Sequence, residues 1–216
     1  MQRIETKILA QLTDASNERN VYLHGFFLAR EIFWQRLENL YGLILLHCSR
    51  QNNVIDFGGG SGVFSLPLSN FFRQVDIIDI DTSDAENIKK HFQLPNVEIL
   101  KQDIRGAGEL KKYDVVIAAD TLEHFENLNE PLHFINKVLA KDGKLFVSLP
   151  TENWLYILGR LLVGKSKPKD HYHSSNQVID FFKNNNFEVV ESRYSPVFIK
   201  MRFPLFYIAV LQKYVS

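Results

Sequence analysis

Apolar residues recur every three or four positions between residues 21 and 47, which is the spacing of one face of an α-helix. The residues that carry this pattern are Phe26, Phe27, Phe33, Leu37, Leu40, Tyr41, Ile44 and Leu45. Gly25 and Gly42 interrupt the pattern, because glycine weakens a helix interior. We therefore predict an N-terminal helical cap over residues 1–49, built from one helix or two.

Beyond residue 50 the pattern changes to short apolar runs that alternate with segments of helical spacing. Strands are expected at 54–57, 75–81, 97–100, 114–119 and 144–149, the last one opened by a turn at Asp142-Gly143. Helices are expected from the first strand through residue 72, at 83–91 and at 128–140. Such alternation is typical of βαβ units, whose parallel sheet is covered by helices on both faces.

The C-terminal part departs from this alternation. It contains an expected helix at 177–185 and strands at 188–194 and 204–213, with no full helix between the two strands. Two such strands favour an antiparallel pair at one edge of the sheet. The predicted fold class is therefore α/β, a doubly wound, seven-stranded, mostly parallel sheet with an antiparallel last strand.

Composition narrows the functional classes. Lys+Arg and Asp+Glu balance at 25 each, so a large nucleic-acid interface is not expected. Cys48 is the single cysteine, which excludes a disulfide framework and suits a cytoplasmic protein. The longest apolar stretch, 154–164, is too short to cross a bilayer, and the N-terminus has no apolar run of signal-peptide type, so no transmembrane segment is expected.

The stretch VIDFGGGSGVF, residues 54–64, places four glycines directly after an expected strand. Glycine costs roughly 0.5–1 kcal/mol relative to alanine within regular elements, so the missing side chains need a reason. A glycine-rich turn between strand and helix lets a ligand approach the backbone at the carboxyl end of the strand. Gly58, Gly60 and Gly62 have this spacing, which NAD, FAD and S-adenosylmethionine sites share.

Asp79 ends the next expected strand, 21 positions after Gly58. An acidic residue about 20 positions downstream of such a turn is typical of a carboxylate that binds the two ribose hydroxyls of a nucleotide cofactor. Asp81 is the alternative, and a helix N-cap is the structural alternative for Asp79. We favour Asp79 because Ile80, Ala85 and Ile88 then lie on the apolar face of the following element.

Four motifs resemble class I S-adenosylmethionine-dependent methyltransferases. Residues 56–62, DFGGGSG, resemble the D-x-G-x-G-x-G motif of that family, and Asp103 follows the third strand where the family binds adenine. YDVVIAADTLEHF (113–125) resembles the fourth strand of the branch that includes ubiquinone-biosynthesis O-methyltransferases (methyltransferase type 11 or 12). KDGKLFVSLPTEN (141–153) resembles the fifth strand, and the resemblance covers about residues 50–213.

The resemblance implies S-adenosylmethionine as cofactor, held by residues 50–150, while 151–216 supply the acceptor-site segment and the antiparallel edge of one domain. The cofactor-binding residues that it implies are Asp56, Gly58, Gly59, Gly60, Gly62, Asp79, Ile80, Asp103, Ile104, Ala119 and Asp120. Asp79 would bind the ribose, Asp103 the adenine, and Ala119 and Asp120 would lie near the sulfonium. Relatives often carry a side chain at position 59, so we expect Gly59 to loosen the turn without removing a contact.

A hydroxyl acceptor must lose its proton, and histidine suits this task because its ordinary pKa lies near neutrality. The candidates are His124, Glu123 and His171, together with His173 and Asp120. Alternatively, Leu122-Glu123-His124 only caps the turn after the fourth strand. An acid-x-x-Glu-His arrangement binds a divalent metal in some O-methyltransferases. Asp120 is shorter than their glutamate, so a metal is possible but not expected; its ligands would be Asp120, Glu123, His124 and His171.

The acceptor is expected to be a small molecule or a lipid- or glycan-linked group, methylated at oxygen. Residues 153–173 resemble an insertion at the acceptor pocket, either a lid helix or an apolar surface that contacts a membrane peripherally through 154–164. Tyr22, Phe33 and Trp34 would form the other wall or ordinary core. The alternatives are a non-catalytic S-adenosylmethionine-binding protein and an NAD-type oxidoreductase. The oligomeric state does not follow from the sequence.

Overall fold

The computed structural model describes residues 1–13, 21–23, 25–108, 110–152, 171–196 and 205–214. Seven strands within these ranges form one sheet: β1 (Asn53–Phe57), β2 (Gln74–Asp79), β3 (Val97–Lys101), β4 (Tyr113–Ala119), β5 (Leu139–Pro150), β6 (Phe187–Ser195) and β7 (Phe206–Lys213). Their order is β3-β2-β1-β4-β5-β7-β6, and β7 is antiparallel to both of its neighbours. The predicted fold class is confirmed.

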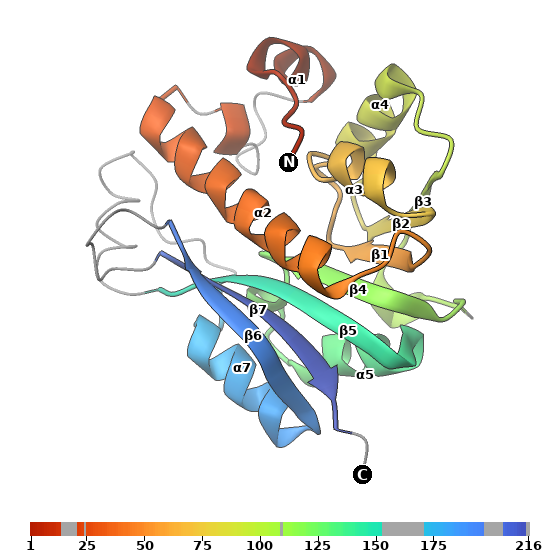
Figure 1. Ribbon diagram of the computed structural model, residues 1–216, viewed down its shortest axis with the longest axis vertical. Helices are drawn as coiled ribbons and strands as arrows, with labels where there is room; N and C mark the ends of the chain where they lie inside the picture. Colours follow the sequence, from red (N-terminus) through yellow and green to blue (C-terminus); the bar gives the residue numbers. More distant parts are fainter. Residues whose placement is uncertain (14–20, 24, 109, 153–170, 197–204, 215–216) are drawn as a thin grey trace.

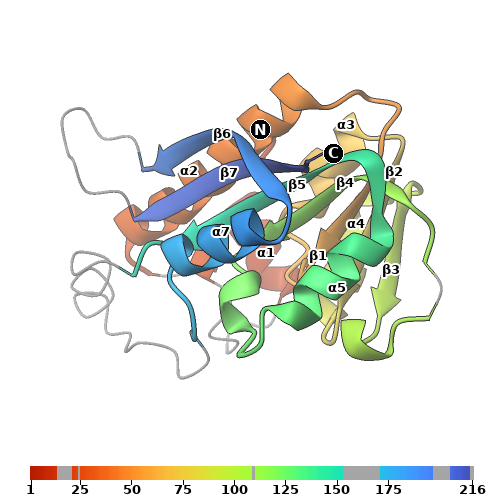
Figure 2. The ribbon, with the colours of Figure 1, turned by 90° about the horizontal axis from the view of Figure 1, so that it is seen from below.

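Helices cover both faces of this sheet (Figure 1). The described helices are α1 (Thr6–Leu12), α2 (Phe27–His47), α3 (Ser65–Phe71), α4 (Ser83–Phe92), α5 (Asn129–Val138) and α7 (Ser175–Asn184), with 3₁₀ turns η1 (Val21–Leu23), η2 (Ile104–Gly106) and η3 (Leu122–His124). One apolar cluster joins α1–α4 to residues such as Val54 and Ile117, and a second joins α5 and α7 to Ile55 and Val116. Figure 2 shows α5 and α7 on the face opposite α2.

The predicted helical cap is dominated by one long helix, α2, preceded by the short turn η1. Leu37, Leu40 and Ile44 are buried as their spacing indicates. Phe26, Phe27 and Leu45 are exposed instead, so the prediction that they share the buried face is wrong. Phe26 precedes α2, and Phe27 and Leu45 fall outside the stripe of α2 that is buried. Helical spacing alone does not define the edges of that stripe.

Strand β5 begins earlier than the pattern indicates. Its first residue, Leu139, pairs with Tyr113, and its next pairing joins Lys144 to Val115. The intervening residues bulge from the sheet, so the predicted turn at Asp142-Gly143 is an irregularity within the strand. Leu139 and Ala140 are apolar, and short apolar runs do not separate the end of a helix from the start of a strand.

The sheet places its motifs at one edge. From β1 the chain proceeds outward to β2 and β3, then returns to pair β4 with the other side of β1. In open α/β sheets, ligands bind outside the carboxyl ends of the strands at such a reversal. The glycine-rich turn, Asp79, Asp103 and the segment after β4 all lie at this edge.

Candidate functional site

The glycine-rich turn after β1 has a backbone geometry that a larger residue would not accept. Gly58 and Gly62 have φ of +80° and +66°, in the left-handed region that favours glycine. A Cβ at Gly60 would lie 2.1 Å from the backbone oxygen of Asp81, and one at Gly62 would lie 2.6 Å from Cα of Ala85. The turn therefore lies directly against the backbone where α4 begins.

Asp79, the last residue of β2, directs its carboxylate at this turn. Oδ2 accepts a hydrogen bond from the backbone N–H of Gly60 at 2.9 Å, and Oδ1 accepts one from the N–H of Asp81 at 3.1 Å. A carboxylate oxygen has about two acceptor sites, so both oxygens can still accept a further donor. The position suits a ligand that lies across the turn.

The neighbours of Asp79 have other roles. Asp81 Oδ1 accepts a hydrogen bond from the hydroxyl of Ser83 at 2.9 Å, at the start of α4. Ala85 and Ile88 are buried, but Ile80 is 60% exposed, so its predicted place on the apolar face is wrong. The chain has left the sheet after Asp79, and Ile80 is no longer covered by a neighbouring strand.

Asp56 is a buried carboxyl group beneath the turn. A Cβ at Gly59 would lie 2.4 Å from Asp56 Oδ2, so Gly59 makes room for this carboxyl group. This close approach adds a spatial reason for glycine at position 59. Burial, together with the negative charge of Asp79, raises the pKa of Asp56 to about 7. A positively charged ligand nearby would stabilise its ionised form.

Asp103 reaches the same edge of the sheet but has a partner there. Its carboxylate accepts the backbone N–H of Arg105 at 2.9 Å and the guanidinium at 2.6–3.0 Å. The Arg105 hydrogen bonds lower the pKa of Asp103. Ile104 packs against the apolar cluster of the α5 face. Arg105 is not among the residues predicted from the sequence, although an acid and an arginine two positions apart are a local signal for this pairing.

Asp120 follows β4 and has φ of +54°, an uncommon backbone conformation for a residue other than glycine. Its carboxylate forms an ion pair with Arg36 and accepts a hydrogen bond from the Ser148 hydroxyl at 3.3 Å. Arg36 is buried in α2 and also donates to the hydroxyl of Tyr22 at 2.6 Å. Arg36 is not among the residues predicted from the sequence; its signal there is a charged residue next to the apolar positions of α2.

Glu123 lies in η3, immediately after β4, and is fully buried with 0% exposure. Neither of its carboxylate oxygens has a hydrogen-bond partner among the described residues. Burial, followed by the charge of Asp120, raises the pKa of Glu123 well above its ordinary range. A buried carboxylate of this kind is costly unless it is protonated or compensated by a cation.

Two histidines complete a group with Glu123. One ligand atom each from Glu123, His124 and His171 lies within 4.8 Å of the others, and the two imidazole rings are 4.7 Å apart. The N–H of Tyr172 donates to the Glu123 carbonyl at 2.9 Å, which joins the two segments. His173 lies outside the group, where its Nε2 donates to the carbonyl of Glu126 at 3.2 Å.

His171 has its own buried partner. Its Nδ1 lies 2.7 Å from Glu152 Oε1, and both side chains are more than nine-tenths buried. Glu152 lies two residues beyond the end of β5 and has φ of +51°, an uncommon backbone conformation for a residue that contacts this group. The role of Glu152 was not predicted from the sequence, because no sequence pattern relates positions 152 and 171.

The residues predicted to form the walls of an acceptor pocket lie partly in the core and partly outside the described residues. Tyr22 and Trp34 are buried core residues with ring centroids 4.8 Å apart, and Phe33 packs against Phe206 at 5.4 Å. Residues 153–170, including the predicted apolar face at 154–164, lie outside the described residues. No helix among the described residues has both the length and the apolar character needed to cross a membrane.

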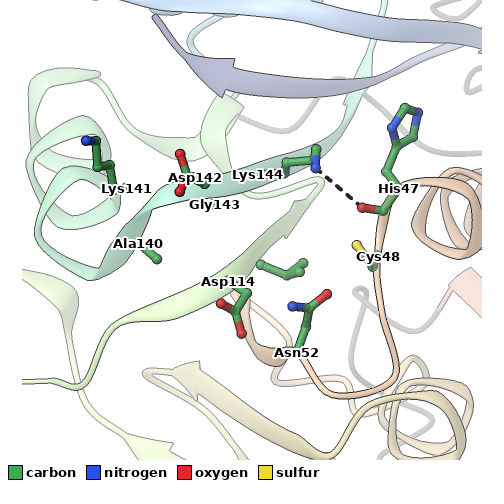
Figure 3. Close-up of a pocket in the computed structure, with 10 residues that line it drawn as sticks. His47, Cys48, Asn52, Asp114, Ala140, Lys141, Asp142, Gly143 and Lys144 are labelled. Carbon is green, nitrogen blue, oxygen red and sulfur yellow. Dashed lines mark hydrogen bonds between the residues drawn. The ribbon is translucent and has the colours of Figure 1, made fainter. Parts of the chain in front are cut away.

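A cavity of about 280 Å³ lies at the opposite edge of the sheet (Figure 3). It is lined by residues that include Cys48, Asn52, Asp114 and Lys144, and Lys144 Nζ donates to the His47 carbonyl at 3.5 Å. None of the predicted site residues lines it. Burial raises the pKa of the Cys48 thiol to about 12, so this cysteine is a poor nucleophile at neutral pH. The predicted site residues lie instead at the carboxyl ends of the strands, which remain the candidate functional site.

Comparison with known proteins identifies the family of the chain. The family described as "Methyltransferase domain" matches residues 29–192. The ubiquinone biosynthesis O-methyltransferase of Rickettsia bellii is 26% identical over 156 residues, 64% of this chain and 62% of that protein. The (S)-coclaurine N-methyltransferase of Thalictrum flavum subsp. glaucum is 30% identical over 115 residues, 49% of this chain and 32% of its own. The chain thus spans about a third to two thirds of the length of these relatives.

Solved structures share the whole fold. Magnesium protoporphyrin IX methyltransferase from Synechocystis PCC 6803, crystallised with S-adenosylhomocysteine, has a TM-score of 0.69 at 19% identity and covers 91% of this chain and 92% of its own. The N-methyltransferase NodS from Bradyrhizobium japonicum WM9, also with S-adenosylhomocysteine, has a TM-score of 0.66 at 16% identity, with 96% of each chain covered.

Proposed function

Because the chain belongs to the methyltransferase domain family of class I S-adenosylmethionine-dependent methyltransferases, we propose that it methylates an oxygen atom of a small-molecule or lipid- or glycan-linked acceptor. The single observation that carries the choice of oxygen is the group of Glu123, His124 and His171 at the carboxyl end of β4. A hydroxyl must be deprotonated during methylation, whereas a neutral amine already has a free electron pair. Imidazole groups suit this proton transfer.

The residues around the glycine-rich turn fit S-adenosylmethionine. Gly58, Gly59 and Gly60 have no side chains that would separate a ligand from the backbone, and a Cβ at Gly60 would meet the Asp79 carboxylate at 2.7 Å. Asp79 would accept both ribose hydroxyls with the acceptor sites left free by Gly60 and Asp81. The exposed side chain of Ile80 would contact the adenine face.

Two further acids would complete the cofactor site. Asp103 would accept the adenine amino group while Arg105 holds its carboxylate in place. Asp56, buried beneath Gly59, would face the positively charged end of the cofactor. Ala119 and Asp120, where β4 ends, would border the sulfonium. S-adenosylmethionine supplies a methyl group that is already activated by its positive sulfur.

The remaining work of the protein is to orient the acceptor and to remove its proton. Orientation of two reactants can supply several kcal/mol of the barrier reduction. His124 and His171 lie within reach of the same point beside Glu123, so the acceptor hydroxyl would lose its proton there. Glu123 would stabilise the positive charge that an imidazole gains in that step.

Thermal unfolding tests the cofactor assignment. S-adenosylhomocysteine at about 100 times its Kd is expected to stabilise the protein by about 2.7 kcal/mol, which raises the Tm of a chain of this size by roughly 5–10 °C. NAD at the same concentration should leave Tm unchanged. Stabilisation by NAD alone would overturn the proposal in favour of an oxidoreductase.

Methyl transfer is tested with S-adenosylmethionine labelled in the methyl group and with polar and lipid extracts as acceptors. We expect the label in a product whose fragmentation places the methyl on oxygen. A product labelled at nitrogen would overturn the oxygen assignment, and binding without transfer to either extract would favour a non-catalytic S-adenosylmethionine-binding protein.

A further inference from the structure

The two imidazoles of the group beside Glu123 have different surroundings. His124 is exposed, whereas the side chain of His171 is only 8% exposed. The two rings meet edge to face, with centroids 4.7 Å apart and an angle of 82° between their planes. Because the ring of His171 is shielded from water, its hydrogen-bond partner decides which of its two nitrogens carries the proton.

Glu152 is the partner that decides this for His171. Its Oε1 lies 2.7 Å from Nδ1 of the ring, and both side chains are buried. A carboxyl group that has a donor partner keeps its ionised form more readily than Glu123, whose oxygens have no hydrogen-bond partner among the described residues. An ionised carboxylate only accepts hydrogen bonds, so Nδ1 carries the proton and Nε2 keeps its electron pair.

We propose that Glu152 is a positioning residue, which holds His171 in the tautomer with the proton on Nδ1, and that Nε2 of His171 takes the proton of the acceptor hydroxyl. This inference rests on the proposed function, and it assigns the proton transfer to one of the two imidazoles. The carboxylate behind the ring also stabilises the imidazolium that forms, because a nearby negative charge favours the charged ring.

The backbone holds this pair in place from two sides. Thr151, which precedes Glu152, donates its N–H to the carbonyl of Leu205 at 3.0 Å. Tyr172, which follows the histidine, donates its N–H to the carbonyl of Glu123 at 2.9 Å. Glu152 itself has φ of +51°, and uncommon conformations of this kind cluster at functional sites, where the surrounding structure maintains them. The geometry of the pair is thus organised by the fold, as efficient proton transfer requires.

The transfer step needs no further reactant. The acceptor O–H bond breaks, and its proton passes to Nε2 of His171. The electron pair left on the oxygen forms the bond to the methyl carbon, while the methyl–sulfur bond breaks and its pair stays on the sulfur, which becomes neutral. The imidazolium still directs its Nδ1 proton at Glu152, and it returns to the neutral ring by releasing the Nε2 proton to solvent.

NMR on the full chain with isotope-labelled histidine measures the tautomer directly, at about pH 8, where an ordinary imidazole is neutral. Correlations between the ring protons and the ring nitrogens separate a protonated from an unprotonated nitrogen, and His171→Asn identifies the signals of this ring. We expect Nδ1 protonated and Nε2 unprotonated, the opposite of the tautomer that a neutral histidine prefers in water. Glu152→Met removes the acceptor at a similar side-chain length and should shift the ring toward the Nε2-protonated form.

Two matched controls should leave the tautomer of His171 unchanged. Glu126→Met removes an exposed acid that follows the group along the chain. His173→Asn removes an imidazole only two positions from His171, whose Nε2 faces the carbonyl of Glu126 instead. Circular dichroism and Tm establish that each variant is folded.

Methyl transfer tests the consequence, with methyl-labelled S-adenosylmethionine and the polar and lipid extracts as the probe. His171→Asn and Glu152→Met should each lower the rate at saturating S-adenosylmethionine by roughly 100-fold or more, the usual contribution of a positioned base, while the effect of S-adenosylhomocysteine on Tm stays the same. Because Glu152 acts through His171, the double variant should lose no more than His171→Asn alone. Glu152→Gln keeps an oxygen that can accept from Nδ1 and should retain part of the rate.

Three results would overturn the proposal. The first is an unprotonated Nδ1 of His171 in the unmodified protein. The second is loss of transfer in His124→Asn but not in His171→Asn. The third is a double variant in which the losses from Glu152→Met and His171→Asn add, since Glu152 would then act independently of the imidazole.

The two proposals fail in different ways. If S-adenosylhomocysteine raises Tm and the methyl group is found on oxygen, but the tautomer of His171 is reversed, only this inference is wrong. If the tautomer is as expected but the label is found on nitrogen or in no product, Glu152 still positions His171, and the proposed function is wrong together with the proton transfer assigned to Nε2.

Discussion

Arg36 of helix α2 forms a buried ion pair with Asp120, the residue that follows β4. The guanidinium also reaches the hydroxyls of Tyr22 and Ser148. The N-terminal helices are thereby joined to the strand end that borders the candidate site. Residues 84 positions apart in the sequence (120 − 36) determine the place of this carboxylate.

Replacing Arg36 alone should lower the free energy of unfolding more than replacing Arg36 and Asp120 together. Arg36→Met leaves the Asp120 carboxylate without its cation, and loss of one partner of a buried pair costs about 3–5 kcal/mol. Asp120 is partly exposed, so we expect the lower end of this range. Adding Asp120→Asn should recover part of the loss. Urea unfolding of both variants and of Asp120→Asn gives the coupling energy; additive losses would mean that the pair contributes nothing.

Asp79→Asn should weaken binding of S-adenosylhomocysteine by roughly 10- to 100-fold, because a hydrogen bond to a charged group contributes about 1.5–3 kcal/mol. The amide oxygen can still accept the N–H of Gly60, so the turn should keep its shape. Asp81→Asn is the control, since that side chain faces Ser83. Calorimetric titration measures both, and a larger loss in the Asp81 variant would transfer the ribose role to Asp81.

Gly60→Ala should abolish detectable cofactor binding and destabilise the protein by about 1–3 kcal/mol, the usual cost of overpacking. The added Cβ would meet the backbone oxygen of Asp81 at 2.1 Å, and backbone atoms do not move aside as a flexible side chain does. Gly106→Ala is the matched control, because a Cβ there has no atom within 4 Å. Unfolding curves that coincide for the two variants would contradict the close packing of Gly60 against the backbone of Asp81.

The raised pKa of Asp56 should make the free energy of unfolding depend on pH. Its pKa in the folded protein is about 7, raised from the ordinary value of 3.8. Below pH about 4 both the folded and the unfolded states are protonated at this residue, and its contribution to stability is fully present. As pH rises toward and through 7, the unfolded state releases the proton first and the folded state loses this stability.

Asp56→Asn cannot ionise and should lack this loss. Between pH 5 and pH 8 the unmodified protein should lose about 2–3 kcal/mol relative to the variant, from 1.36 kcal/mol per pKa unit. Urea unfolding without cofactor at the two pH values measures the difference. Parallel pH profiles would show that Asp56 is not a buried acid with a raised pKa.

Much of the fold follows from local pattern. The strands at 54–57 and 97–100 were expected within one residue of β1 and β3, since buried strands of a parallel sheet are short apolar runs bounded by turns. The start of β5 was not expected correctly, because Leu139 continues the apolar pattern of α5. The exposure of Phe26, Phe27 and Ile80 was also missed, since hydrophobicity does not report which side chains a neighbouring element covers.

The sequence by itself determined the order of strands and helices, the glycine-rich turn and the acid at the end of β2. These depend on periodicity and on backbone conformations that only glycine adopts readily, and both are properties of neighbouring residues. Only the tertiary structure decided that Arg36 meets Asp120 and that Glu152 lies beside His171. It also decided that Glu123 is buried with no hydrogen-bond partner among the residues that the structure describes. Those contacts join segments that the sheet brings together, so their energies depend on distances in space that the order of residues does not encode locally.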